Sequence, residues 1–293
     1  MNIRPVITVV GAFTLLFAVF AALIFLVSSM YGDSKGFSLT EKIGVVEVLG
    51  PITASKKIIE DLKTFERDES VKAIVLRVDS PGGGVGPAQE IYAAVKALKS
   101  KPVIISMGSV AASGGYYIAA PASHVFANPG TITGSIGVLM EFPDIEALLE
   151  KIGLNRRVIK SGEFKDIGSP VREITPDEQR LLQELIDDVY MQFVEAVANG
   201  RNLDIDRVKE LADGRIFSGR QAKEFGLVDE LGGLQSAIEY SARRVGITDE
   251  PNVVYPKPEP ISIIDLILKR TTASLEQYLH QGEQAQLLML WNN

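Results

Sequence analysis

Residues 109–120 read SVAASGGYYIAA, a serine followed by two glycines and set among alanines. The stretch comes directly after VIISMG (103–108), a short apolar run that is typical of a buried strand. A helix is expected to begin near Ser113, which would place its hydroxyl and the Gly114 N–H at the positive end of that helix. The pattern fits a nucleophile beside an oxyanion site, and it fits a plain serine cap of the helix equally well.

Strands and helices alternate on both sides of this stretch. Apolar runs and turn residues predict five strands, at 43–50, 73–80, 103–108, 124–130 and 155–162. Apolar spacing predicts helices at 55–68, 87–99 and 176–199, the last begun by Thr175 and Pro176, and a mixture of brief strand, helix and turn at 214–233. This alternation predicts an α/β fold with a mostly parallel sheet.

The N-terminal segment VITVVGAFTLLFAVFAALIFLV (6–27) contains no charged residue. It is long enough for a helix to cross a hydrocarbon core of roughly 30 Å, and the following SSMYGDSK is a poor cleavage site. We therefore expect one uncleaved N-terminal transmembrane helix. Arg4 and the terminal amine favour a cytoplasmic N-terminus and an extracytoplasmic catalytic domain at a bacterial-type cytoplasmic membrane.

Four regions are predicted along the chain: an anchor at 1–30, a linker at 31–40, a catalytic domain at 41–250 and a C-terminal tail at 251–293. The tail opens with YPKPEPIS, whose three prolines predict an extended linker. The ISIIDLILKRTTASLEQYLH stretch that follows is amphipathic. It is expected either to form an interface or membrane-surface helix or to pack on the catalytic domain.

The composition restricts both the partners and the catalytic chemistry. A formal net charge of -7 argues against nucleic-acid binding, and the absence of cysteine excludes disulfides and thiol catalysis. Two isolated histidines cannot form a zinc cluster, so no metal and no cofactor are predicted. His124 has no evident acid partner and His280 lies in the tail, which disfavours a Ser-His-Asp triad. A lysine remains as the base, since a neutral amine can accept the serine proton.

Two further stretches could complete such a site. In DSPGGGV (79–85) a strand runs into three glycines, whose backbone N–H groups can approach an oxyanion or an extended peptide closely. Lys165 lies in SGEFKDIGSP (161–170), a probable loop between glycine-containing turns. Composition alone does not select Lys165 over an ordinary surface lysine.

Four motifs together resemble one family. RVDSPGGGV, SVAASGGYYIAA, NPGTITGSIGV and GEFKDIGSP, in this order, are similar to the signature stretches of the S49 peptidases, the signal peptide peptidase A family. The resemblance covers roughly residues 43–240. It implies a spiral α/β fold related to the crotonases and to the proteolytic subunit of Clp protease.

The resemblance also implies roles for individual residues. Ser113 would be the nucleophile and Lys165 the general base of a Ser-Lys dyad. Gly114, and Gly83 from the glycine turn, would supply oxyanion N–H groups, although the choice of Gly83 among its glycine neighbours is open. Ser135 in TGSIG would orient the Lys165 amine, or would be no more than a turn serine.

The activity implied is that of a membrane-anchored serine endopeptidase that degrades cleaved signal peptides and other hydrophobic peptides. The family's single-domain members assemble into homo-oligomeric rings, and Ser113 and Lys165 could pair within one subunit or between two. One alternative is a sibling S49 peptidase that cuts a specific membrane protein. A crotonase-like acyl-CoA enzyme or a non-enzymatic membrane scaffold are others, but neither accounts for both Ser113 and Lys165.

Overall fold

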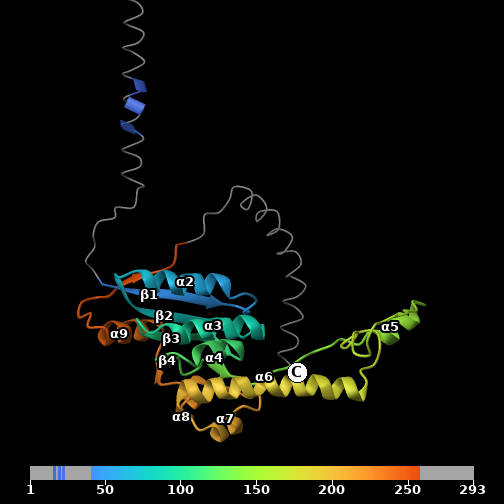
Figure 1. The fold of residues 1–293 in the computed structure, drawn as a ribbon. Coiled ribbons are helices and arrows are strands. Elements are labelled where there is room, and N and C mark those ends of the chain that lie inside the picture. The colour runs from blue at the N-terminus through green and yellow to red at the C-terminus, as the bar shows by residue number, and fades with distance from the viewer. Residues whose placement is uncertain (1–15, 18, 21, 24–40, 258–293) are drawn as a thin grey trace, which may run out of the picture. The chain divides into compact units, whose positions relative to one another are not determined.

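The computed structural model describes residues 16–17, 19–20, 22–23 and 41–257 (Figure 1). The predicted tail helix lies outside these residues, and so does most of the predicted membrane span. Within the described ranges, no helix is both long enough and apolar enough to cross a membrane.

The described part of the chain is built on one sheet of eight strands. The strands are β1 (Lys42–Leu49), β2 (Val71–Ser80), β3 (Val103–Ala112), β4 (His124–Ala127), β5 (Ile132–Gly134), β6 (Ile216–Ser218), β7 (Glu230–Leu231) and β8 (Asn252–Val254). Their order is β6-β5-β3-β2-β1-β8, with β4 beside β3 and β7. Every neighbouring pair is parallel except β5 with β6, which confirms the predicted α/β fold with a mostly parallel sheet.

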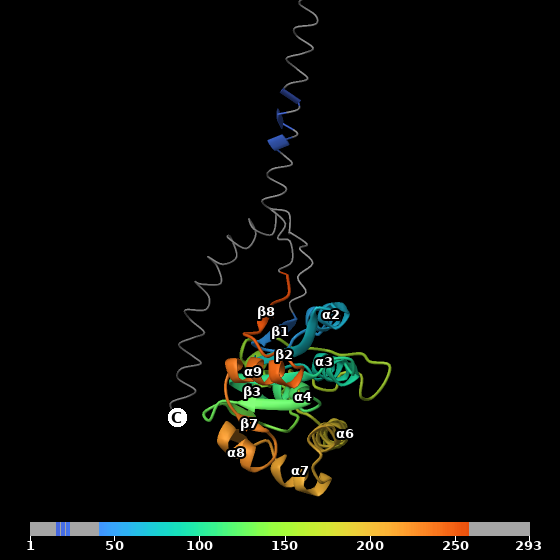
Figure 2. The same ribbon diagram turned by 90° about the vertical axis from the view of Figure 1, so that its left-hand side faces the viewer.

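Helices cover both faces of this sheet (Figure 2). The helices of the described residues are α2 (Lys56–Arg67), α3 (Val85–Ala97), α4 (Gly114–Ala119), α5 (Glu146–Lys151), α6 (Pro176–Arg201), α7 (Ile205–Leu211), α8 (Gly219–Glu224) and α9 (Leu234–Arg244), of which α5 lies away from the sheet (Figure 1). Alternate residues of β1 face opposite sides: Ile43 and Val45 join the core under α9, while Val46 and Val48 join the larger core under α2, α3, α4 and α6. A strand buried on both faces needs apolar residues throughout, which is why 43–49 carries so few polar ones.

The register of the parallel strands sets the position of the site. Leu49 lies opposite Asp79 and Ser80 lies opposite Ala111, so β1, β2 and β3 all end at the same edge of the sheet. In open parallel sheets this carboxyl edge is where ligands bind. The DSPGGGV turn and Ser113 therefore leave neighbouring strands at the edge that is suited to a site.

The predicted strand at 155–162 is wrong. These residues belong to an arm, residues 138–175, that extends away from the sheet and includes α5 (Figure 1). Val158 and Ile159 are exposed and have no neighbouring strand in the described chain. A β-branched pair favours extended backbone, but a strand is stable only where another strand accepts its hydrogen bonds.

The predicted start of α6 is confirmed. Thr175 Oγ1 accepts a hydrogen bond from Glu178 N at 3.3 Å, and the Glu178 carboxylate accepts one from Thr175 N at 3.0 Å, so the two residues form a capping box. The helix has 26 residues and is therefore about 39 Å long. Its second half is buried through Phe193, Val194 and Val197, whereas its first half extends past the core (Figure 1).

The Tyr116 hydroxyl provides a test of this core. It is fully buried and donates to Leu227 O at 2.9 Å, and its burial raises the pKa of the phenol. Tyr116→Phe should lower the free energy of unfolding by about 1–2 kcal/mol, because a buried carbonyl loses its donor. Tyr92→Phe, at a partly exposed ring, should change it by less than about 0.5 kcal/mol. Urea unfolding of the two variants measures the difference, and equal midpoints would contradict this account of the core.

Candidate active site

Ser113 stands in a strained turn between β3 and α4. Its φ and ψ are 52° and -122°, although it is not glycine. The turn is held by its backbone, since Ser113 N donates to Gly134 O at 2.9 Å and Ser113 O accepts from Tyr117 N at 2.9 Å. The side chain makes no cap hydrogen bond, so Ser113 holds the cap position without acting as a cap. Strain of this kind clusters at functional sites, and a strand-to-helix turn with positive φ is also how other hydrolases expose a nucleophilic serine.

The glycine turn after β2 leaves one N–H group free. Gly82 N donates to Ser80 Oγ at 3.1 Å, and Gly84 N donates to Ile52 O at 2.9 Å. Gly83 N–H has no hydrogen-bond partner within residues 41–257. A Cβ atom at Gly83 would lie only 2.6 Å from Ile52 N, so the backbone approaches Ile52 as closely as glycine alone permits. The turn therefore presents the Gly83 N–H rather than those of its neighbours.

The two turns abut. Gly114 is the first residue of α4, so its N–H has no acceptor within the helix. A Cβ atom at Gly114 would lie 3.3 Å from Gly83 N, and one at Gly82 would lie 2.9 Å from Ser113 Cβ. Two unpaired N–H groups thus lie beside the Ser113 hydroxyl. This is the donor arrangement that stabilises an oxyanion formed by attack of a serine on a carbonyl.

Ser135 follows β5 and lies on the other side of Ser113. Its φ is 50°, and its N–H donates to Arg215 O at 2.8 Å. Ser135, Ser113 and Gly83 line one groove of about 760 Å³, which continues to Asp187 and Tyr190 of α6. The structure therefore brings together four of the five predicted site residues: Ser113, Gly114, Gly83 and Ser135.

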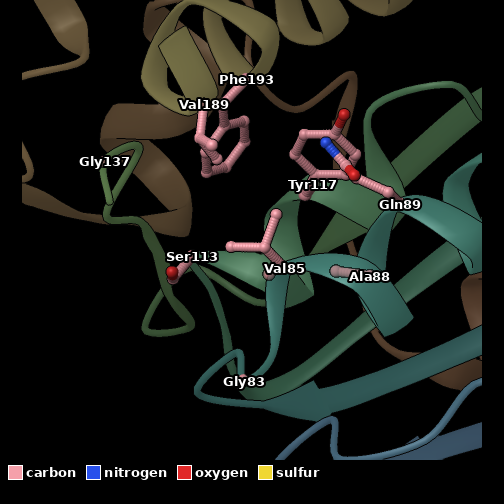
Figure 3. Close-up of a pocket in the computed structure, with 10 residues that line it drawn as sticks. Gly83, Val85, Ala88, Gln89, Ser113, Tyr117, Gly137, Val189 and Phe193 are labelled. Carbon is pink, nitrogen blue, oxygen red and sulfur yellow. The ribbon is translucent and has the colours of Figure 1, made fainter. Parts of the chain in front are cut away.

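A small apolar pocket opens beside Ser113, with a volume of about 40 Å³ (Figure 3). Val85 and Ala88 of α3 form one wall and Val189 and Phe193 of α6 form another, with Tyr117 at the closed end. Burial raises the pKa of the Tyr117 phenol, which keeps the ring neutral. Sequence reasoning missed these pocket residues, because helical spacing predicts α3 and α6 but not which faces of the two helices meet.

Lys165, the fifth predicted site residue, does not line the groove or the pocket that contain Ser113. It is exposed in a turn of the arm, where its backbone N–H donates to Gly162 O at 3.2 Å. The turn is tied to Glu178 near the start of α6, whereas Phe193 borders the Ser113 pocket. Fifteen residues of helix separate Glu178 from Phe193, which corresponds to about 22 Å along the axis of α6. The subunit therefore holds Lys165 apart from its own Ser113.

An ion-pair network fixes the Lys165 turn to α6. The Arg172 guanidinium donates to both oxygens of Asp166, at 3.0 and 2.9 Å, and also to the Glu178 carboxylate. Lys160 Nζ donates to Asp166 as well, at 2.7 Å. Hydrogen bonds from Arg172 hold the pKa of Asp166 well below its usual range and lower that of Glu178 to about 2. The contribution of this network to the free energy of unfolding is fully present above about pH 4.5 and is lost as the pH falls through the lowered pKa of Glu178 at about 2, since the network needs both carboxylates ionised.

The arm exposes an unusual number of apolar side chains. Leu139 is 80% exposed and Ile159 is fully exposed, and others follow along the arm and the first turns of α6: Met140, Phe142, Leu148, Ile152, Leu154, Val158, Phe164, Leu181 and Leu185. Apolar surface this extensive marks an interaction surface on a folded protein. Within the described residues, no group of histidine and carboxylate side chains is placed to hold a metal ion.

Comparison with known proteins places these features in a family. The model of peptidase family S49 matches residues 96–248. A provisionally named protease of Synechocystis sp. is 48% identical over 228 residues, which are 75% of this chain and 82% of that one. A provisionally named signal peptide peptidase SppA of Enterococcus faecium is 40% identical over 68% of this chain and 59% of its own. The chloroplastic serine protease SPPA of Arabidopsis thaliana is 32% identical over 83% of this chain and 35% of its own.

The fold, the strained serine and these similarities define a class of hydrolase, the serine peptidases. More specifically, the chain belongs to peptidase family S49.

Gly83 offers a direct test of the two N–H groups. Gly83→Ala forces a Cβ atom against Ile52 and displaces the N–H, so peptide cleavage should fall by about 10²-fold or more. Gly86→Ala is the matched control, because no atom lies within 4 Å of a Cβ at Gly86 in α3, and it should leave cleavage unchanged. Initial rates on a fluorogenic peptide give the comparison, and an active Gly83→Ala protein would remove Gly83 from the site.

A substitution of Arg172 tests whether the ion-pair network of Arg172, Asp166 and Glu178, here called the clamp, holds the Lys165 turn on α6. Arg172→Gln should increase the rate of tryptic cleavage at Lys160 and Lys165 several-fold at neutral pH, because the turn opens when the network is lost. Arg180→Gln removes only an exposed pair with Asp177 and should leave that rate unchanged. Mass spectrometry of the fragments measures both. Unchanged cleavage of Arg172→Gln would mean that contacts other than the ion pairs hold the turn.

Proposed function

We propose that this peptidase is anchored by its N-terminal segment and uses a Ser113-Lys165 dyad to degrade cleaved signal peptides and other hydrophobic peptides. The observation that carries the proposal is the Ser113 turn. Its hydroxyl makes no cap bond, it lies beside two unpaired N–H groups, and it opens onto an apolar pocket. The mostly parallel sheet is compatible with the Clp-protease-like spiral that the resemblance implies.

The chemistry follows from these groups. The neutral Lys165 amine takes the proton of Ser113 Oγ as that oxygen attacks the peptide carbonyl, and the oxyanion accepts hydrogen bonds from Gly83 and Gly114 N–H. Collapse of the tetrahedral intermediate breaks the C–N bond, and the amine leaves with the proton returned by the lysine. Water then attacks the acyl-enzyme with the same base and regenerates Ser113. Ser135, in the same groove, is the candidate to orient the amine.

Lys165 is proposed to act on Ser113 of a neighbouring copy. Within one chain, the clamp ties the Lys165 turn to Glu178, which lies about 22 Å along α6 from Phe193 at the Ser113 pocket. The exposed apolar side chains of the arm would be buried against a second copy, and that contact would carry Lys165 to the neighbour's groove. A closed ring, as the resemblance implies, would give every subunit one complete dyad.

The substrate class is supported by the pocket and by the N-terminal segment. The apolar pocket of about 40 Å³ beside Ser113 accepts a small aliphatic side chain of a peptide. An anchor at 6–27 would keep the groove near a membrane, where spent signal peptides remain after export. A relative from Enterococcus faecium carries the corresponding name. A sibling peptidase specific for one membrane protein would be distinguished by failure to degrade signal peptides.

The decisive experiment combines two inactive variants. Purified Ser113→Ala and Lys165→Ala proteins should each fail to cleave a synthetic signal peptide. Subunits of the two variants, dissociated and reassembled together, should regain activity, because a mixed oligomer contains some interfaces with both an intact Ser113 and an intact Lys165. Product mapping by mass spectrometry gives the cleavage sites.

Two results would contradict the proposal. Wild-type activity in Lys165→Ala would remove the lysine from the mechanism. Reassembly that restores the oligomer but no activity would place both dyad residues within one subunit. A Lys223→Ala protein, altered at an exposed residue of α8, serves as the matched control and should cleave normally.

A further inference from the structure

A second cleft lies at the opposite edge of the sheet from Ser113. It has a volume of about 600 Å³ and is bordered by Pro102 and Val103, where β3 begins. Ser113 follows the other end of β3, so about 30 Å of strand separates the two sites. The cleft therefore has no part in the chemistry at Ser113.

The charged residues that line this cleft are all cationic. They come from the end of α3, the following loop and the end of α9: Lys96, Lys99, Lys101 and Arg244. No carboxylate lines it, although the chain as a whole has a formal net charge of -7. Four cations facing one space in an acidic protein generate a local positive potential, which favours an anionic ligand.

One of these cations is held in a fixed position. Lys101 Nζ donates to Phe65 O and to Asp68 O, both at 2.6 Å, at the end of α2. An ammonium group has three N–H donors, so one remains for a ligand. The nearby Asp68 carboxylate accepts hydrogen bonds from Ser70, and Glu66 accepts one from Ser100. These acids lie beside Lys101 but do not border the cleft.

The remaining lining is mostly apolar. Leu98, Pro121 and Val245 border the cleft together with other apolar residues, and Ser123 supplies a hydroxyl. The volume exceeds what a lone inorganic ion fills and falls within the range of sites for organic ligands. A cleft lined by cationic and apolar residues matches an amphiphile that carries a phosphate.

The cleft is also on the edge where the chain enters the domain. Lys42, at the start of β1, pairs with Val71 at the start of β2, and Ile74 N donates to Pro102 O beside the cleft. Residues 28–40 connect the predicted anchor to this edge and can span at most about 45 Å. If the anchor is in the membrane, its lipid headgroups are within reach of this edge.

We propose that the cleft formed by Lys96, Lys99, Lys101 and Arg244 binds a phosphate-bearing anion, supplied by the headgroup of an anionic phospholipid. The anion site rests on the cleft alone. The choice of a lipid as its source rests in addition on the proposed membrane anchor.

The absence of native cysteine allows a sharp test. Ser123→Cys places a single thiol in the cleft of the full chain, held in neutral detergent micelles, and its rate of alkylation by N-ethylmaleimide reports occupancy. Phosphatidylglycerol should protect this thiol, whereas phosphatidylcholine should not. Adding Lys99→Gln and Arg244→Gln should raise the phosphatidylglycerol concentration that halves the alkylation rate by about 30-fold. Each cation near an anionic lipid contributes about a factor of five to the affinity. Lys63→Gln with Lys223→Gln, two exposed cations outside the cleft, should leave that concentration unchanged.

Each result decides the proposal. Equal protection by phosphatidylcholine, or protection that survives Lys99→Gln with Arg244→Gln, would overturn the site. Protection by millimolar inorganic phosphate that equals that of phosphatidylglycerol would keep the anion site and overturn the lipid as its source. A thiol at Glu224→Cys, exposed on α8, should be alkylated at the same rate in every condition. Signal-peptide cleavage by the same proteins is scored separately, so loss of lipid binding is not confused with failure of the Ser113 dyad.

Discussion

The site depends on contact between two pieces of backbone. The turn after β2 and the turn after β3 meet so closely that a Cβ atom at Gly82 would lie 2.8 Å from Gly114 N. Ile52 holds the turn after β2 through a one-residue parallel bridge to Gly83. Gly134 O holds the turn after β3 by accepting a hydrogen bond from Ser113 N. Both turns are thereby fixed, and Gly83, Ser113 and Gly114 line one pocket.

This arrangement explains how a strained conformation persists. A non-glycine residue at φ 52° costs of order 1–3 kcal/mol, and only surroundings that leave no alternative can maintain it. At Ser113 these surroundings are β3, which enters the turn, β5, which pairs with β3, and α4, which leaves it. The short β5 strand thereby does more than extend the sheet, since its last residue, Gly134, accepts the hydrogen bond that fixes the Ser113 turn.

The sequence was sufficient for the strands β1 to β4 and for the turn at Ser113, and insufficient for the short strands β5 and β8 and for the arm. Buried parallel strands such as 73–80 are nearly continuous apolar runs, a local pattern that needs no knowledge of partners. The stretch at 155–162 has only Val158 and Ile159 as apolar residues, and no neighbouring strand pairs with it in the described chain, which is a tertiary property. In the same way, SGEFKDIGSP contains both Lys165 and Asp166, yet only the structure shows that Asp166 joins Arg172 and Glu178 to fix the turn.

The length of α6 has a consequence for how this chain can vary. The helix joins the wall of the Ser113 pocket at Phe193 to the clamp at Glu178, so it acts as a spacer of fixed length. A substitution on its solvent face leaves that length unchanged. Deleting a single residue between the two points would shift the arm by about 1.5 Å and rotate it by about 100° around the axis. We infer that the solvent face of this segment tolerates changes of residue type, whereas the segment as a whole hardly tolerates changes of residue number, unlike the surface loops that join the other elements.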